Sequence, residues 1–199
     1  MEDMHTSLDD DDLVVNPNER EITLVSSDYH SFSIKSRVLK LSRMLHVAFE
    51  ADGGQSHSVQ INVSGNVLGL IVHYLQMCDG NPPPRILCPL QGTCMSDNTV
   101  ISNVNWINLI CPEGIPFHLA SEEQKECLFS LLEASNYLGV DSLMELVAAK
   151  IACMHKLMSM DDCETVLQQH NPDALKDIRT QVSKRIKDLR EKHKAKTSA

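Results

Sequence analysis

Three cysteines and one histidine between residues 81 and 118 are the side chains whose types could most directly do chemistry. Zinc in proteins is bound by Cys thiolates and His imidazoles, so this group is a candidate zinc set. Its members are Cys88, Cys94, Cys111 and His118. Paired ligands in compact zinc sites usually lie about two to four residues apart, and no two members lie that close in the sequence. The spacing therefore does not favour a metal site.

The same residue types could form a nucleophilic Cys–His pair, because the members of such a pair meet in space and not in sequence. The chain has nine His and seven Cys, and nothing in the sequence singles out one pair. The glycine-rich nucleotide loops, the zinc-protease helix motif and the G-x-S-x-G hydrolase turn are all absent from the sequence. We therefore expect a protein that is not an enzyme and that has no cofactor and no catalytic or metal-binding residues.

Composition excludes other classes of protein. Of the 199 residues, 42% are apolar and 23% are charged, as in an ordinary globular domain with appendages. Aromatic residues make up 4% and the formal net charge is −9, and both values argue against surfaces that stack the bases of nucleic acids. No stretch reaches the roughly 18 consecutive apolar residues of a membrane span. We expect the protein to bind neither nucleic acid nor membranes.

The cysteines and the N-terminal residues bear on the compartment. No C-x-x-C pair occurs, and the chain is longer than small disulfide-rich domains, so the cysteines are expected to be small buried hydrophobes. The first dozen residues are acidic, whereas a secretory signal begins with basic residues and an apolar stretch. The sequence therefore predicts a cytoplasmic and nuclear protein.

The two ends of the chain carry opposite charge. Residues 1–20 are rich in carboxylates and poor in large apolar side chains, which predicts a disordered acidic tail. Basic residues dominate the other end, and residues 191–199 are expected to form a basic disordered tail. The run Lys184 to Lys187 is either a nuclear-import or phosphate-binding patch or a solvated helix end whose cations suit the helix dipole.

Apolar spacing in the first part of the chain predicts strands and helices in alternation. Apolar and polar residues alternate around Ile22 and Ile34, which predicts a short β-hairpin. From Ser36 the spacing becomes helical, and the Asp-Gly-Gly sequence at 52–54 should end this helix. Alternation over residues 59–63 predicts a third strand.

A second helix is expected to follow, with Ser64 as its N-cap. Gly80 and the three prolines at 82–84 should end it. Residues 81–118 are rich in Pro, Gly and Cys and have only short apolar runs. They are expected to form a long loop or insertion that is dispensable for folding, because the entropy of loop closure varies slowly with length.

Residues 121–190 are predicted to be helical. Ser121 to Gln124 has the form of a capping box, and the helix that it begins should end at Gly139. Asp141 should cap the next helix, and a short helix should begin at residues 161–162. A last helix should begin at Asn171-Pro172, with an apolar stripe on an otherwise charged surface. The stripe consists of Leu175, Ile178, Val182, Ile186 and Leu189.

This order of elements resembles the BTB/POZ fold as used by the Skp-type adaptor (S-phase kinase-associated protein) of SCF ubiquitin ligases. The sequence Leu-Phe-Ser-Leu-Leu-Glu-Ala-Ser-Asn-Tyr-Leu over residues 128–138 is similar to the family's L-F-x-L-I-x-A-A-N-Y-L segment. The family's first strand and turn resemble residues 21–28, its first helix resembles residues 39–45, and its third strand resembles residues 61–63. The family's triple proline recurs at residues 82–84. The resemblance covers residues 20–80 and 118–190.

The resemblance implies an α+β fold with a small three-stranded sheet packed with helices, followed by a C-terminal helical extension. The BTB/POZ core would span residues 21–158, with the insertion at 81–118, and the extension would span residues 159–190. Elongin C shares this core but ends soon after the Asn-Tyr helix, so the extension favours the Skp type. The chain departs from the family by lacking its P-E-E-I-R sequence and its terminal Trp-Cys-Glu.

An adaptor of this family binds a cullin and F-box proteins without covalent chemistry. The resemblance implies that Asn136 and Tyr137 contact the cullin. Alternatively, the ring of Tyr137 covers the core while Asn136 satisfies the helix end. The extension would bind the F-box partner through apolar side chains, unless they pack on their own domain. The proposed F-box contacts are Met154, Met158, Val166, Leu167, Leu175, Ile178 and Val182.

Two further expectations follow from the resemblance. Without a partner the exposed apolar surface could lead to a homodimer. The alternative function is a BTB scaffold, like elongin C or in another multiprotein assembly, that has no cullin or F-box partner. Under either function, the insertion at 81–118 could be a lineage-specific loop or an extra contact surface.

Overall fold

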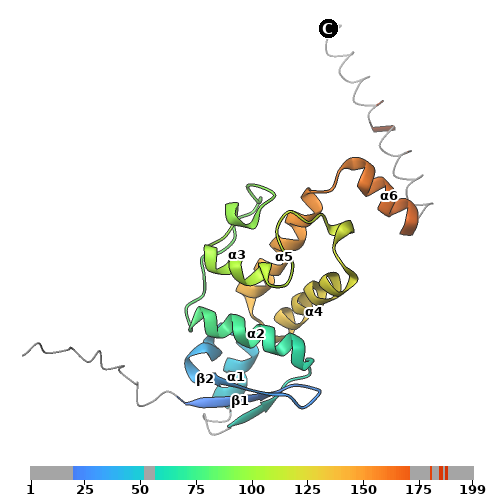
Figure 1. Ribbon diagram of the computed structural model, residues 1–199. Coiled ribbons are helices and arrows are strands. Elements are labelled where there is room, and N and C mark those ends of the chain that lie inside the picture. The colour runs from blue at the N-terminus through green and yellow to red at the C-terminus, as the bar shows by residue number, and fades with distance from the viewer. Residues whose placement is uncertain (1–19, 52–56, 171–179, 181–183, 186, 188–199) are drawn as a thin grey trace, which may run out of the picture. The chain divides into compact units, whose positions relative to one another are not determined.

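The computed structural model describes residues 20–51, 57–170, 180, 184, 185 and 187, with only the backbone for 167–170. Up to residue 170, these residues form two compact units (Figure 1). The first comprises residues 20–83, apart from 52–56, together with 133–143; the second comprises 84–132 and 144–170. None of the helices in the described part is long and apolar enough to cross a membrane.

The first unit contains a mixed three-stranded sheet in the order β2-β1-β3. Strand β1 (Glu21–Val25) pairs antiparallel with β2 (Ser31–Lys35) and parallel with β3 (Ser58–Gln60). The predicted hairpin is therefore confirmed. Strand β3 is shorter than predicted because the chain turns after Ile61: the Ile61 N–H still donates to the Val25 carbonyl (2.7 Å), but the Val63 N–H donates back to the Ile61 carbonyl (2.9 Å).

The helix predicted from Ser36 is divided into a 3₁₀-helix η1 (Ser36–Leu41) and α1 (Arg43–Ala51). Ser42 stands between them with extended backbone angles (φ −118°, ψ 115°). Its buried hydroxyl donates to the Leu138 carbonyl (2.6 Å) and accepts from the Leu45 N–H (3.2 Å). This hydroxyl therefore caps α1 and also ties it to the end of a helix distant in sequence.

Helix α2 (Gly65–Cys78) begins as predicted, but Ser64 makes no side-chain capping bond. The first amide of the helix, on Gly65, donates instead to Asp28 Oδ1 (2.8 Å). Asp28 lies in the β1–β2 turn, where the Ser26 hydroxyl also donates to its carboxylate. These hydrogen bonds, with that from Ser26 the largest cause, lower the pKa of Asp28 to about 2. The N-terminal cap is therefore supplied by the hairpin that lies beside α2 in Figure 1.

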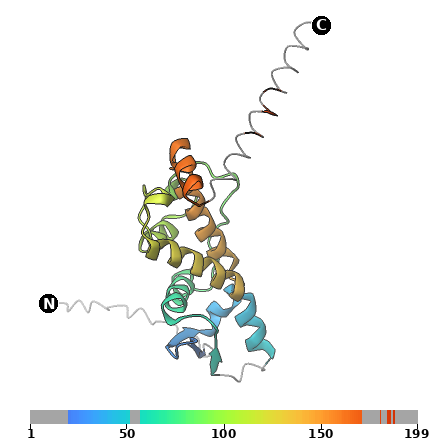
Figure 2. The same ribbon diagram turned by 90° about the vertical axis from the view of Figure 1, so that its right-hand side faces the viewer.

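The second unit is helical. It contains η2 (Met95–Asp97), α3 (Ile101–Asn108), η3 (Phe117–Leu119) and α6 (Met160–His170), and shares α4 (Glu122–Leu138) and α5 (Asp141–Lys156) with the first unit. The capping box at the start of α4 is confirmed, because the Gln124 N–H donates to Ser121 Oγ (3.2 Å) and the Ser121 N–H to Gln124 Oε1 (3.1 Å). In Figure 2 the chain turns directly from the end of α5 into α6.

The structure corrects the interpretation of residues 81–118 as a long loop. This segment holds η2, α3 and η3, and it supplies a large part of the core of the second unit. Its side chains with at most 5% exposure include Met95, Val104, Trp106, Ile107 and Cys111. The sequence signal was weak because α3 is only eight residues long and is surrounded by prolines, which are typical of loops.

A buried lysine holds the same segment to α5. Lys150 is 2% exposed, and its ammonium donates to Asn108 Oδ1 (3.3 Å) and to the Pro112 carbonyl (3.1 Å). Burial is the largest cause that lowers the pKa of this amine, and the neighbouring Cys111 and Glu113 act in the opposite sense. Lys150 therefore ties the last residue of α3 and the chain that follows it to α5.

The apolar stripe of the last predicted helix lies outside the described residues, as do most of both predicted tails. Thr180, Lys184, Arg185 and Lys187 are described, and they are helical and exposed. The helical state of the C-terminal segment agrees with the prediction at these four positions, whereas the stripe itself stays a prediction.

Candidate partner-binding surfaces

The last turn of α4 presents Asn136 and Tyr137 on the surface of the first unit. Asn136 is exposed, and Tyr137 is 52% exposed. Within the described residues, the Asn136 side chain makes no hydrogen bond, and the carbonyls of this turn are satisfied by other groups. The Gly139 N–H donates to the Asn136 carbonyl (3.1 Å), and the Val140 N–H donates to that of Ser135 (2.8 Å). Both side chains are thus available to a partner.

The turn that follows is fixed in place by the first unit. Gly139 has a φ of +67°, the left-handed conformation that glycine adopts most readily. Its carbonyl accepts the Arg43 N–H (3.2 Å), and the Arg43 guanidinium pairs with Asp141 at 2.9 Å. A Cβ on Gly139 would lie 3.0 Å from that of Arg43. The surface that bears Tyr137 is therefore preorganised, which lowers the entropic cost of binding.

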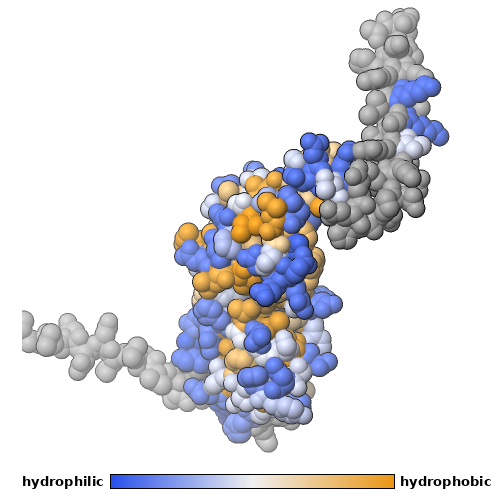
Figure 3. Space-filling view, turned by 45° about the vertical axis from the view of Figure 1, so that its right-hand side comes forward, coloured by the Kyte–Doolittle hydropathy of each residue, from blue (hydrophilic) through white to orange (hydrophobic). Residues whose placement is uncertain are grey.

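The second unit contains a groove with a volume of about 710 Å³, lined by residues of η3, α4, α5 and α6. Its apolar lining residues are Phe117, Phe129, Met158 and Val166. The side chains of Met158 and Val166 are half-buried, and Phe129 is 48% exposed. Figure 3 shows apolar side chains (orange) that reach the surface between hydrophilic ones (blue). A groove of this size with an apolar lining can accept side chains from a partner helix.

Aromatic rings form one wall of the groove. Phe117 stacks on His155, with ring centroids 4.4 Å apart, and meets Phe129 edge-to-face at 6.0 Å. The ammonium of Lys125 lies 5.6 Å from the centroid of Phe117. Because these rings come from η3, α4 and α5, their contacts hold three separate segments around the groove.

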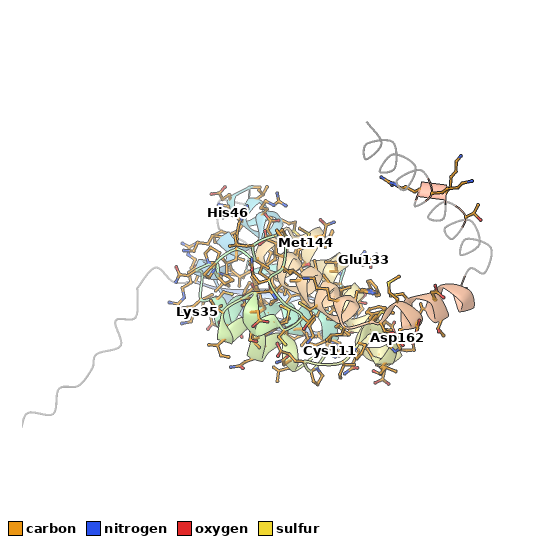
Figure 4. All side chains as sticks on the ribbon, turned by 90° about the horizontal axis from the view of Figure 1, so that it is seen from above. Lys35, His46, Cys111, Glu133, Met144 and Asp162 are labelled. Atoms are coloured by element: carbon orange, nitrogen blue, oxygen red, sulfur yellow. The ribbon has the colours of Figure 1, made fainter. Side chains whose placement is uncertain are left out.

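Ionisable groups form the rest of the wall. His118 Nε2 lies 3.6 Å from Asp162 Oδ1, and Lys125 Nζ donates to Glu122 Oε1 at 2.8 Å. Asp162, labelled in Figure 4, also accepts the Ser159 hydroxyl (2.7 Å) and the Ser159 N–H (2.9 Å). The hydrogen bond from the Ser159 hydroxyl is the largest cause that lowers the pKa of Asp162. The groove therefore combines an apolar lining with a charged edge.

Comparison with known proteins shows what the chain is similar to. Residues 20–78, which lie in the first unit, match the family model described as "Skp1 family, tetramerisation domain". The chain is also similar to an S-phase kinase-associated protein 1 homolog from Tetrahymena thermophila, with 25% identity over 142 residues, or 71% of this chain and 78% of that protein. These matches support a Skp1-type protein. The predicted α+β fold, a POZ domain with a three-stranded sheet and a helical extension, is confirmed.

The predicted F-box residues fall into three groups. Met158 and Val166 line the groove. Met154 is only 2% exposed, and its sulfur lies 3.8 Å from that of Cys111, so it belongs to the core of the second unit and not to its surface. For Leu167 only the backbone is described, and Leu175, Ile178 and Val182 lie outside the described residues.

Sequence reasoning missed Phe117, Phe129 and His155. Phe129 belongs to the stretch that carries the family resemblance, and its position on α4 would have allowed it to be found. Phe117 comes from the segment interpreted as a loop, and His155 stands at a helix end. No spacing rule links these two residues to each other, because their contact is tertiary.

The candidate zinc set is spread over the second unit. Cys88 is exposed, Cys94 is half-buried, Cys111 is buried, and His118 pairs with Asp162. Among the residues that the structure describes, no three His, Cys, Asp or Glu side chains lie close enough together to hold a metal ion.

Proposed function

We propose that this Skp1-type protein is an adaptor subunit of an SCF-type cullin-RING ubiquitin ligase, which bridges a cullin to F-box proteins by non-covalent binding. Family membership supports an SCF adaptor role in general. The observation that carries the bridging proposal is the groove on the second unit, because an adaptor needs an accessible surface for its variable partner. In this proposal the protein acts in ubiquitin-dependent protein breakdown in the cytoplasm and the nucleus.

The F-box side of the proposal rests on Met158 and Val166. Both side chains line the groove, and their remaining exposed surface would be buried by a docked helix. Burial of a large apolar side chain stabilises a complex by up to about 1.5–3 kcal/mol. A few such contacts, together with Phe117 and Phe129, would outweigh the entropic cost of association. Leu167, Leu175, Ile178 and Val182 would extend this interface.

The cullin side rests on Asn136 and Tyr137. Tyr137 exposes about half of a large ring, and tyrosine offers wide contact area with few rotamers and a polar tip. Because Arg43, Gly139 and Asp141 fix the turn next to it, the ring stands on a rigid support. The two proposed interfaces are carried by different elements of the chain.

Affinity purification of the tagged full-length chain followed by mass spectrometry tests the proposal. Recovery of a cullin together with F-box proteins is the expected result. Recovery of other complexes without a cullin would favour the BTB scaffold instead. That alternative has one observation in its favour, because Leu87, Ile101 and Leu109 of the second unit are each at least 70% exposed.

Two double variants separate the interfaces, and each serves as the control for the other. Asn136→Lys with Tyr137→Lys should reduce cullin recovery and leave F-box recovery unchanged. Met158→Asp with Val166→Asp should have the opposite effect. Thermal unfolding of each variant checks that the fold is intact. If the Asn136/Tyr137 variant is destabilised like a core mutant, the ring of Tyr137 is a structural group; unchanged cullin recovery would reject the cullin assignment.

A further inference from the structure

One face of α4 combines charge and aromatic surface inside the groove. Glu122, Glu126 and Phe129 all line it, and their spacing of four and three residues places them on the same side of the helix. Glu126 thus stands one turn before the ring of Phe129. Phe129 is 48% exposed, so part of the ring is accessible next to the carboxylate.

Most charged groups of the groove already have partners. Glu122 pairs with Lys125, and Asp162 accepts from Ser159 and lies beside His118. Glu126 is different: within residues 20–51 and 57–170, no cation lies within ion-pair distance of it and its side chain makes no hydrogen bond. A docked apolar helix would remove water from this carboxylate and offer it no hydrogen bond in return, which costs free energy. A docked acidic helix would bring further negative charge to the carboxylates of Glu122, Glu126 and Asp162, which like-charge repulsion disfavours.

An arginine on the partner can contact both the Glu126 carboxylate and the Phe129 ring. Its planar guanidinium can stack on an aromatic ring and donate two parallel hydrogen bonds to a carboxylate. A lysine provides only a point charge and cannot form this forked contact. We propose that Glu126 and Phe129 form an arginine-binding subsite, so that the groove selects amphipathic partner helices with an arginine beside their apolar face. The inference rests on the proposed function of the groove and adds the chemistry that it selects.

Synthetic peptides test the subsite directly. The probes are fluorescein-labelled amphipathic helices that share one Leu/Phe face and carry a single Arg, or Gln in its place, at each position that flanks this face. Their affinity for the full-length chain is measured by fluorescence anisotropy. The best Arg peptide should bind about five- to tenfold more tightly than its Gln counterpart, as expected for one exposed ion pair and one cation–π contact. This advantage should shrink as salt is raised to about 0.5 M.

Protein variants then locate the effect. Glu126→Gln should remove the preference for Arg and leave the affinity for the Gln peptide unchanged. Glu123→Gln is the matched control, because Glu123 is exposed on the same helix but does not line the groove; it should keep the preference. Phe129→Leu should retain apolar contact and weaken only the preference for Arg.

Three results would overturn the inference: equal affinity of the Arg and Gln peptides, an equal effect of Glu123→Gln and Glu126→Gln, and no binding of any peptide. The proposed function is tested separately by the affinity purification. If F-box proteins are recovered while the peptides show no preference for Arg, the adaptor role stands and the subsite is rejected. If the preference is found without a cullin or F-box proteins, the subsite belongs to a different assembly.

Discussion

Replacement of Ile107 by Ala tests whether the segment 84–118 is part of the core. Ile107 lies in α3 and is fully buried, whereas Ile101, in the same helix, is 70% exposed. The two positions therefore offer the same chemical change in the same element, at opposite extremes of burial.

The expected magnitude follows from this difference. Loss of a buried Ile side chain costs about 2–5 kcal/mol, because transfer energy is lost and a cavity remains. At Ile101 little packing is lost, and Ala has the better helix propensity by a few tenths of a kcal/mol. Ile101→Ala should therefore change the free energy of unfolding by less than about 0.5 kcal/mol. Because both variants make the same change in α3, their difference of about 2–5 kcal/mol measures mainly burial.

Urea unfolding followed by tryptophan fluorescence is the appropriate assay. The chain has one Trp, and Trp106 lies in α3 with 2% exposure, so its emission reports on the second unit. Ile107→Ala should lower the urea midpoint of this transition and lower the melting temperature by roughly 4–20 °C. If the two variants shift the midpoint equally, or if deletion of residues 84–118 leaves a stable second unit, the segment is not core and the reasoning is refuted.

Three smaller predictions follow from other contacts. Because its folded pKa is depressed, Asp28 adds stability above its ordinary pKa of 3.8 that is lost as the pH falls toward about 2; acid titrations by circular dichroism should show that Asp28→Asn removes this part of the pH dependence. Burial lowers the pKa of Lys150 below its ordinary value of 10.5, so the charged amine destabilises the fold until it loses its proton. As the pH rises toward 10.5, the denaturant midpoint of the unmodified chain should therefore rise relative to that of Lys150→Met. A constant difference between the two midpoints would contradict the assignment. Ser121→Ala removes one half of the capping box and should destabilise the chain by about 0.5–2 kcal/mol in urea unfolding, whereas the exposed Ser102→Ala should have little effect.

Local signals predicted most of the first unit and the start of α4 in the second. The hairpin follows from alternation around Ile22 and Ile34, and the start of α4 follows from a capping box whose two bonds involve residues only three apart. Ser42 and Ser64 show the limit of such signals. Ser42 interrupts a helical pattern because its hydroxyl bonds to Leu138, and Ser64 is not the side-chain cap because Asp28 takes that role from the hairpin. Both outcomes depend on a neighbour that is distant in sequence.

The sites show the same division. Asn136 and Tyr137 were predicted at the end of a helix, and their exposure agrees with that prediction. The apolar residues Met154 and Met158 looked equivalent in the sequence, yet one is covered by Cys111 and the other lines the groove. The aromatic wall was not predictable because Phe117, Phe129 and His155 come from three separate elements.

The sequence by itself determined the hairpin, the main helices and the capping box of α4, since these depend on periodicity and on side chains that act on their own segment. Only the tertiary structure decided that α3 belongs to the core, that Lys150 holds it, and that Glu126 and Phe129 line the same groove. The physical reason is that burial and ion pairing depend on what covers a side chain. The position of a residue in the sequence pattern determines which face of a helix or strand it occupies. The packing of the other elements determines whether that face meets the core, the solvent or a partner.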